Sequence, residues 1–322
     1  MVQTLRKELI GVVKATLLGS VLSNLLLVLG MSFFFGGIVG TKGKKQETMT
    51  GSRQSAIVST RVSTIQKQES YTEFVGEKVQ TYSVLTALVN TSMLLLSCLS
   101  FSLVTVFATA TSDGNAVMAD VLLPVSRICS VIIMTAYGAY IFFQLVTHRE
   151  VMAEDTSGDD EEEGEAALSI GTAIGVMLAC TLIVAFCSDL LVASLEGVVE
   201  HAGISEHFIG IVLLPIVGNA CEHASAIRFA IMDKCGLSIG IAVGSSTQIS
   251  LFVVPFSVLV GWMIGQPMDL NFGSLNTTVM SISVVVVLSV VVDGTANWLQ
   301  GYLLMSAYFV VAVLYWHLPN DH

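Results

Sequence analysis

The sequence predicts an all-α polytopic membrane protein with about eight transmembrane helices. Hydrophobic residues make up 53% of the 322 positions and charged residues only 12%, whereas soluble domains carry roughly 25% charged residues. The mean hydropathy is +0.78. Apolar runs recur along the chain, and a helix needs about 20 apolar residues to cross the hydrocarbon core. This composition gives no indication of a nucleic-acid partner and predicts that membrane lipid surrounds the chain.

Eight apolar runs are predicted to span the membrane. The first begins just after Arg6 and Lys7 and is too long for the hydrophobic region of a cleaved signal peptide. Each of the others is long enough to cross the bilayer as a helix, straight or tilted. The predicted spans cover residues 9–39, 83–109, 121–146, 168–197, 207–232, 236–264, 275–293 and 297–317.

Lys and Arg residues concentrate in alternate linkers. The first linker, 40–82, is polar and basic, the third contains Arg149 and the fifth contains Lys234, whereas the second, fourth and sixth linkers contain no Lys or Arg. The positive-inside rule therefore places the 40–82 linker in the cytosol and the N-terminus on the opposite side. The basic residues of the first linker are Lys42, Lys44, Lys45, Arg53, Arg61, Lys67 and Lys78.

An acidic linker divides the chain. Residues 148–167 separate a first part, 1–147, with three spans, from a second part, 168–322, with five spans. The run "EDTSGDDEEEGEAAL" at 154–168 is predicted to lie in the cytosol. It is either a solvated connection or an electrostatic funnel that concentrates cations near a pore entrance.

Two spans that cross in opposite directions share a pattern. The first contains "LLGSVLSNLLLVLG" at 17–30, and the sixth contains "AVGSSTQISLFVVP" at 242–255. Small and hydroxyl residues in membrane helices often serve only close packing. A similar sequence that crosses in the opposite sense also indicates an inverted repeat, in which secondary transporters place their substrate site. The matching pairs are Gly19 and Gly244, Ser20 and Ser245, and Ser23 and Gln248.

The fifth predicted span contains a cluster of polar residues. Pro215 and Gly218 predict a kink or an unwound turn near Val217. Asn219 and Glu222 are three residues apart and share a face beside that break. An ionisable residue inside a membrane span is functional by default. The carboxylate and amide oxygen atoms of these two side chains are the type of ligand that calcium prefers. The same spacing recurs at Ser245 and Gln248.

These motifs resemble those of a known family. The run "GNACEHASAIRFA" at 218–230, followed by "GSSTQISLFVVPF" at 244–256, resembles the second signature repeat of the calcium/proton (cation/proton) exchangers of the calcium/cation antiporter superfamily. The runs "SRICSVIIMTAYGAYIFFQLVTH" at 126–148 and "DGTANWLQG" at 293–301 resemble the same family in the same order. The resemblance implies an inverted-repeat cation-exchanger fold.

The resemblance also implies which residues form the site. Glu222 is expected to bind the cation and to exchange it for protons, and Glu222 and Gln248 are the expected metal ligands. Gly218, Asn219 and Ser245 are expected to complete this site, and Ser20 and Ser23 to line the same cavity from the first repeat. His223 marks the proton-coupled branch of the superfamily; it is either a proton relay or a packed neutral histidine.

The implied activity is secondary antiport of calcium or a similar divalent cation against protons, by alternating access, across a vacuolar or other acidic endomembrane. Such a protein is not an enzyme, needs no cofactor beyond the transported ions, and could form a homo-oligomer. A membrane metallohydrolase is disfavoured because Glu222 and His223 do not have HExxH spacing.

The chain departs from the family pattern at one point. Family members carry one GNxxE motif in each repeat, and no such motif precedes the 17–30 run here. The first repeat is therefore expected to be incomplete, as in an N-terminally truncated exchanger that lacks a second carboxylate. The alternative is a transport-incompetent fragment or a partner subunit of such an exchanger.

Overall fold

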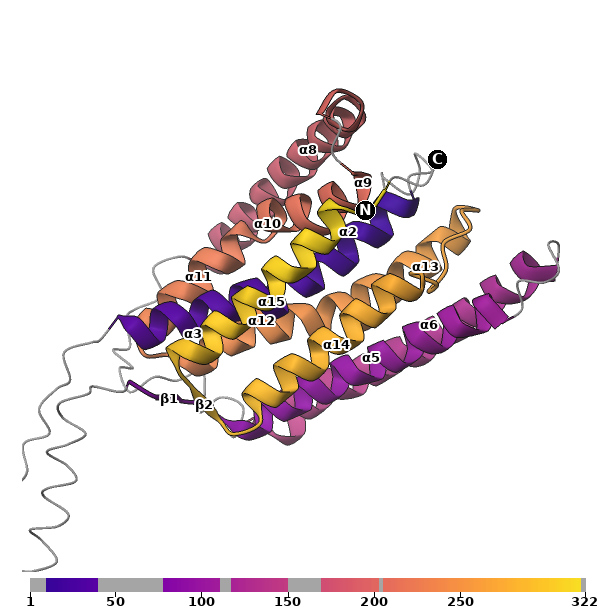
Figure 1. The fold of residues 1–322 in the computed structure, drawn as a ribbon. Coiled ribbons are helices and arrows are strands. Elements are labelled where there is room, and N and C mark those ends of the chain that lie inside the picture. Colours follow the sequence, from indigo (N-terminus) through magenta and orange to yellow (C-terminus); the bar gives the residue numbers. More distant parts are fainter. Residues whose placement is uncertain (1–9, 40–77, 111–116, 150–168, 203–204, 320–322) are drawn as a thin grey trace, which may run out of the picture.

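A computed structural model describes residues 10–39, 78–110, 117–149, 169–202 and 205–319. Within these ranges the chain is almost entirely helical, and the helices lie roughly along one another in an elongated bundle (Figure 1). The all-α prediction is therefore confirmed. Two two-residue strands, β1 (Gln80–Thr81) and β2 (Thr295–Ala296), form the sheet structure of the described residues.

The helices follow the predicted order of spans. The first part of the chain contains α2 (Ile10–Leu22), the π-helix η1 (Ser23–Val28), α3 (Leu29–Ile38), α5 (Val84–Ala110), α6 (Val117–Phe142) and the π-helix η2 (Phe143–Thr147). The second part contains α8 (Ile170–Ala202), α9 (Glu206–Phe208), the π-helix η3 (Ile209–Leu213), α10 (Leu214–Gly218), α11 (Ala220–Ile231), α12 (Cys235–Gln248), the π-helix η4 (Ile249–Val253), α13 (Val254–Met263), α14 (Ser274–Val291) and α15 (Trp298–Trp316).

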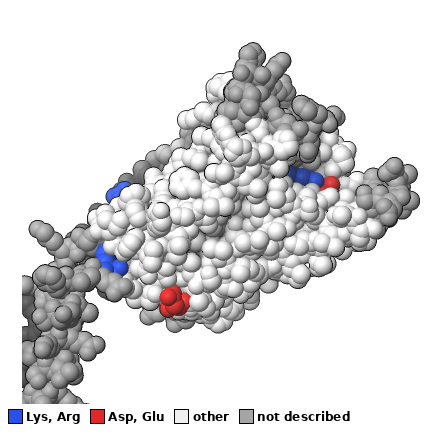
Figure 2. All heavy atoms as spheres, viewed as in Figure 1, with Lys and Arg blue, Asp and Glu red and all other residues white. Residues whose placement is uncertain are grey.

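Six continuous helical segments of the described chain are long and apolar enough to cross a membrane, and a bent pair of helices gives a seventh. These seven coincide with predicted spans, and the remaining predicted span coincides with α8, which is apolar over Ile170–Val184. The face shown in Figure 2 carries very few Lys, Arg, Asp or Glu side chains, as expected of a surface that faces lipid. The chain is therefore a multi-pass membrane protein.

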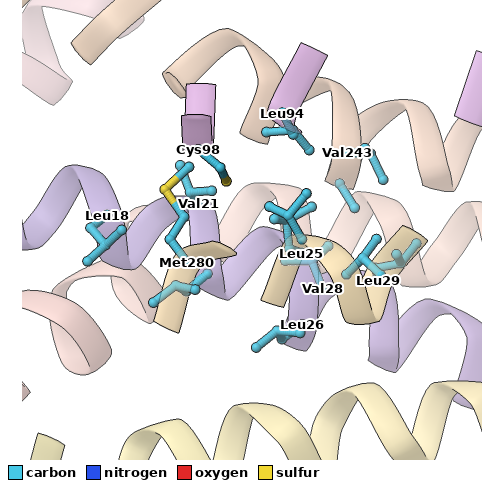
Figure 3. Close-up of a cluster of buried hydrophobic side chains, with 14 of the residues drawn as sticks. Leu18, Val21, Leu25, Leu26, Val28, Leu29, Leu94, Cys98, Val243 and Met280 are labelled. Atoms are coloured by element: carbon cyan, nitrogen blue, oxygen red, sulfur yellow. The ribbon is translucent and has the colours of Figure 1, made fainter. Parts of the chain in front are cut away.

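The first span lies at the centre of the bundle. The continuous segment Ile10–Ile38 is 72% buried, more than any other candidate span of the described residues. Leu25 and Leu29 of this segment lie in one buried cluster with Leu94 of α5 and Val243 of α12 (Figure 3). The α3 part also packs against α15 and α11. The motif of the first repeat is therefore surrounded by helices of the second.

Glycines allow this close packing. A Cβ atom on Gly19 of α2 would lie 2.3 Å from the carbonyl oxygen of Ile211 and 2.6 Å from Cγ of Pro215. A Cβ atom on Gly301 of α15 would lie 2.2 Å from the backbone nitrogen of Phe34. Real Cβ atoms do not approach other atoms so closely, so any side chain here would force the helices apart.

Residues 78–81, here called the clasp, connect the helix ends on the side of the bundle where α3 ends. Strand β1 pairs antiparallel with β2, with Gln80 opposite Ala296. The Gln80 Nε2 atom donates to the carbonyl oxygen of Ala230 at 2.8 Å and to Oδ1 of Asp233 at 2.7 Å. Lys78 donates to the carbonyl oxygen of Val39 at 3.1 Å. The clasp, residues 78–81, therefore joins α3, the turn between α11 and α12, and the turn between α14 and α15.

The predicted division of the chain stays a prediction. The acidic run 154–168 and the linker residues 40–77 lie outside the described residues. The structure does show that the first and second parts of the chain are packed together, since α2 and α3 contact helices α11, α12 and α15.

Candidate functional site

The fifth span bends where its polar cluster begins. Helix α10 ends at Gly218 and α11 starts at Ala220, and the segments on the two sides of this break are inclined by 58°. Pro215 lies in the first turn of α10, directly after the π-helix η3. The bend falls at Asn219, two residues later than the predicted position near Val217.

The backbone at this bend is curved and not unwound. The Asn219 N–H donates to the carbonyl oxygen of Pro215 at 2.8 Å, and the His223 N–H donates to that of Asn219 at 2.9 Å. Helical hydrogen bonds therefore continue through the break. Fewer carbonyl groups are freed for a ligand than a fully unwound turn would supply, so side chains must provide most of the polar atoms.

Asn219 connects the two repeats. Its side chain is buried, and Nδ2 donates a 3.3 Å hydrogen bond to the carbonyl oxygen of Ser20 in α2. Ser20 belongs to the run that the sequence predicts as the partner repeat. The structure therefore brings one predicted residue of each repeat into direct contact, as expected of a site at a repeat interface.

His223 lies next to this contact. Its Nδ1 atom lies 2.6 Å from the carbonyl oxygen of Asn219, so Nδ1 is the nitrogen that carries a proton in the neutral ring. The Nε2 atom is then an acceptor, and it is buried without a partner among the described residues. An unpartnered acceptor at this place is consistent with a proton relay, although the ring could equally be a packed neutral histidine.

Glu222 is partly buried in the first turn of α11. No hydrogen bond or ion pair joins its carboxylate to any residue that the structure describes. The amide groups of the helix start favour a negative charge at this position. The carboxylate therefore has no competing partner among the described residues and is free to take a cation or a proton.

The predicted residues of the sixth span lie at the end of α12. Gln248 is its last residue and is exposed, and Ser245 is partly buried one turn earlier. Between them, Ser246 and Thr247 are fully buried, and their hydroxyl groups lie 3.4 Å from the carbonyl oxygens of Val21 and Asn90. Helices α11 and α12 pack against each other. The convergence of Glu222 and Gln248 on one ion remains a prediction.

The sequence-based interpretation overlooked one residue. Asn24 follows Ser23 in η1, both side chains are fully buried, and neither atom of the Asn24 amide has a hydrogen-bond partner among the described residues. A single amide in the apolar run "LSNLLLVLG" was the available signal. A buried amide without partners is costly, which marks Asn24 as a further polar group in the interior of the first repeat.

The two matching spans share an unusual backbone feature. When Gly19 is aligned with Gly244, the π-helix η4 falls on residues 24–28, which lie inside the π-helix η1. π-Helical turns are rare and often mark functional sites. Their occurrence at corresponding positions supports the inverted repeat. Ser23 and Gln248 nevertheless differ in environment, since Ser23 is buried and Gln248 is exposed.

The described residues contain no group of three or more His, Cys, Asp or Glu side chains that could hold a metal ion. The predicted ligands of the cation comprise one carboxylate, Glu222, and neutral oxygen atoms such as that of Gln248. Gly218 contributes no side chain and lies exposed at the end of α10, beside the bend.

Comparisons with known proteins agree with this architecture. Residues 168–316 match the model of the family described as sodium/calcium exchanger protein. The chain is 37% identical over 317 residues to "Vacuolar cation/proton exchanger 3" of Oryza sativa subsp. japonica, covering 97% of this chain and 67% of that relative. It is 34% identical over 319 residues to the "Vacuolar calcium ion transporter" of Schizosaccharomyces pombe (strain 972 / ATCC 24843), covering 99% and 68%.

A solved structure supports the fold as well. The structure of native YfkE superposes with a TM-score of 0.70 at 30% sequence identity, covering 98% of this chain and 78% of that one. The fold and the site motifs define a multi-pass membrane protein with the inverted-repeat exchanger fold. The chain belongs to the cation/proton exchanger family. It spans about two thirds of the length of the curated relatives that it matches, between 60% and 68% for three of them.

Proposed function

We propose that this chain is a secondary antiporter that exchanges calcium, or a similar divalent cation, for protons across a vacuolar or other acidic endomembrane. The observation that carries the proposal is the carboxylate of Glu222, which pairs with no residue that the structure describes and lies one turn from the bend at which Asn219 joins the two repeats. The names of the relatives, which include vacuolar cation/proton exchangers and a Ca2+/H+ antiporter, support transport and not catalysis.

The exchange follows from competition for one carboxylate. A carboxylate can hold a proton or contribute a negatively charged oxygen to a cation, but it cannot do both at full strength. Gln248, Asn219 and Ser245 would add neutral oxygen atoms, and His223 could pass the proton. Alternate exposure of this group to the two sides of the membrane then couples movement of the cation to movement of protons in the opposite direction.

The charge balance separates this proposal from its alternative. Calcium with one carboxylate leaves one positive charge uncompensated in a medium of low dielectric constant, which is unfavourable. The alternative, a transport-incompetent fragment or partner subunit, would not need to solve this problem. The comparisons favour the exchanger. The matched relatives are named as exchangers and transporters, and the matches cover almost the whole of this chain.

Uptake by reconstituted vesicles tests the proposal. Vesicles with an acidic interior should take up calcium when they contain the chain. Glu222→Gln should abolish uptake, because the amide keeps the shape but cannot ionise, and Glu222→Asp should retain part of it. Asp293→Asn is the matched control, since Asp293 is an exposed acid in the turn after α14. Full uptake by Glu222→Gln would contradict the mechanism.

A second part of the uptake experiment tests the alternative that the chain is a transport-incompetent fragment. If the wild-type chain shows no uptake and gains it only when a GNxxE-bearing segment is fused before Met1, the fragment interpretation holds for the isolated chain. Uptake by the unfused chain would exclude that interpretation.

A further inference from the structure

Arg127 carries a positive charge inside a candidate membrane span. It lies in α6, six residues after the start of the span Val121–Thr147, or about 9 Å along the helix axis. No described residue forms a hydrogen bond or ion pair with its guanidinium, and Nε is buried without an acceptor. Charges inside membrane spans normally have a partner, so this one requires a counter-charge from elsewhere.

An indole ring holds the guanidinium in place. The Cζ atom of Arg127 lies 4.8 Å from the centre of the Trp262 ring. Trp262 is the penultimate residue of α13, and 55% of its surface is exposed. Tryptophan at the end of a membrane helix is typical of the headgroup region. The cation–π contact orients the guanidinium but does not neutralise its charge.

Neighbouring contacts place Arg127 near one end of the bundle. The Oγ atom of Ser126 accepts a 3.2 Å hydrogen bond from the backbone of Leu270, in the loop between α13 and α14. This loop lies at the end of the bundle where α2 begins (Figure 1). A long arginine side chain at that depth can extend its charged group to the headgroup region.

The acid of that loop, Asp269, is already paired with another residue. Oδ1 of Asp269 lies 2.7 Å from Nζ of Lys14 and accepts the Asn271 N–H at 2.6 Å. Asp269 therefore neutralises Lys14, whereas no acid of the described ranges pairs with Arg127.

We propose that Arg127 and Trp262 bind the phosphate group of an anionic phospholipid in the membrane leaflet on the side where α2 begins. The planar guanidinium presents paired N–H donors that match phosphate oxygens. The exposed ring of Trp262 would contact the glycerol and upper acyl region of the same lipid. The charge of the lipid would supply the counter-ion that the described part of the chain lacks.

Tryptophan quenching by brominated lipid tests this site. Trp298→Phe and Trp316→Phe leave Trp262 as the single tryptophan of the chain. The protein is placed in phosphatidylcholine nanodiscs with a minor fraction of lipid that carries brominated acyl chains. Brominated phosphatidylglycerol should quench Trp262 more than the same fraction of brominated phosphatidylcholine. We expect about fivefold enrichment of the anionic lipid at the site, which corresponds to roughly 1 kcal/mol.

Substitutions of Arg127 distinguish a specific lipid site from general attraction of anionic lipid to the protein. Arg127→Gln should remove the excess quenching, and Arg127→Lys should retain part of it, because the charge remains but the planar fork is lost. Arg149→Gln removes an exposed charge from the far end of α6 and η2 and should leave the excess unchanged. Excess quenching that persists in Arg127→Gln would overturn the proposal, as would equal quenching by the two lipids in the unsubstituted protein.

Two additional measurements cover a failure of Arg127→Gln to fold and the alternative of free phosphate as the ligand. Arg127→Lys provides an answer if Arg127→Gln fails to fold, which circular dichroism would reveal. Partial or complete loss of the excess in a folded Lys variant supports a guanidinium site, and full retention contradicts it. Added inorganic phosphate should not reduce the excess quenching. Displacement of the lipid by inorganic phosphate would assign the site to free phosphate and overturn the lipid proposal.

Discussion

The side-chain amide of Asn219 donates a 3.3 Å hydrogen bond to the backbone carbonyl of Ser20, 199 residues earlier in the chain. Asn219 forms the bend of the fifth predicted span, and Ser20 lies in the centrally buried first span. This contact joins the sequence motifs of the two repeats at the place where the proposed site lies. It also ties the orientation of α11, which carries Glu222, to the position of α2.

Asn219→Ala should weaken this connection. Asn219 is 6% exposed, and the loss of a buried hydrogen bond costs about 1 kcal/mol of the free energy of unfolding. Ser20→Ala is the matched control for stability, because the acceptor is the backbone carbonyl and survives the substitution. Thermal unfolding in detergent measures both variants. A loss of stability in Ser20→Ala as large as that in Asn219→Ala would show that the hydrogen bond is not the cause.

Gly19→Ala should destabilise the protein strongly. The added methyl group would lie 2.3 Å from the carbonyl oxygen of Ile211, a backbone atom that cannot move without shifting η3. Overpacking of this kind costs about 1–3 kcal/mol. Gly11→Ala in the same helix is the control, because nothing lies within 4 Å of the position of its Cβ atom. Comparable stability of the two variants in detergent would show that α2 and η3 are less tightly packed than described.

Gln80→Glu should open the clasp in a pH-dependent way. The new carboxylate would replace an amide that lies 2.7 Å from Oδ1 of Asp233, so two acids would face each other. Two ionised carboxylates at this distance repel each other, and binding of a proton by the pair removes the repulsion, so the clasp should open as pH rises and close again as pH falls. Thr81→Glu, at an exposed neighbouring position, should show no such recovery. Hydrogen exchange of residues 230–234 reports the opening.

The pair formed by Lys14 and Asp269 should contribute measurably to stability. Its N–O distance is 2.7 Å, and its two side chains are only 18% and 16% exposed. A double-mutant cycle with Lys14→Met and Asp269→Asn should give a coupling energy of about 1–2 kcal/mol. The pair of Lys78 and Asp233, at 3.7 Å with Asp233 58% exposed, should give less than about 1 kcal/mol. The reverse order would contradict this ranking.

The distribution of basic residues predicts the orientation in the membrane. In a variant without its native cysteines, Thr81→Cys and Ser157→Cys should react with an impermeant reagent added to the cytosolic side of sealed organelles. Ser274→Cys, exposed at the start of α14 on the opposite side, should be protected. Protection of either of the first two positions, with reaction at Ser274→Cys, would reverse the proposed topology.

Much of the fold follows from the sequence alone. In a bilayer every backbone N–H and C=O group must find a partner within the protein, so each long apolar run must become a helix. This constraint explains why the predicted spans coincide with described helices. The bend in the fifth span was predicted within two residues from Pro215 and Gly218. The motifs around Glu222 and Gln248 also identified the family, because their residue types and spacing are specific.

Only the tertiary structure shows which of these helices occupies the centre of the bundle. An apolar helix has the same composition whether lipid or protein surrounds it, so periodicity cannot distinguish the buried first span from the exposed ones. The contact of Asn219 with Ser20, the burial of Asn24 and the isolation of Arg127 all join or separate residues that are distant in sequence. Such relationships depend on how complete helices pack. The sequence therefore determined the elements and the chemistry of this protein, and packing decided which polar groups meet.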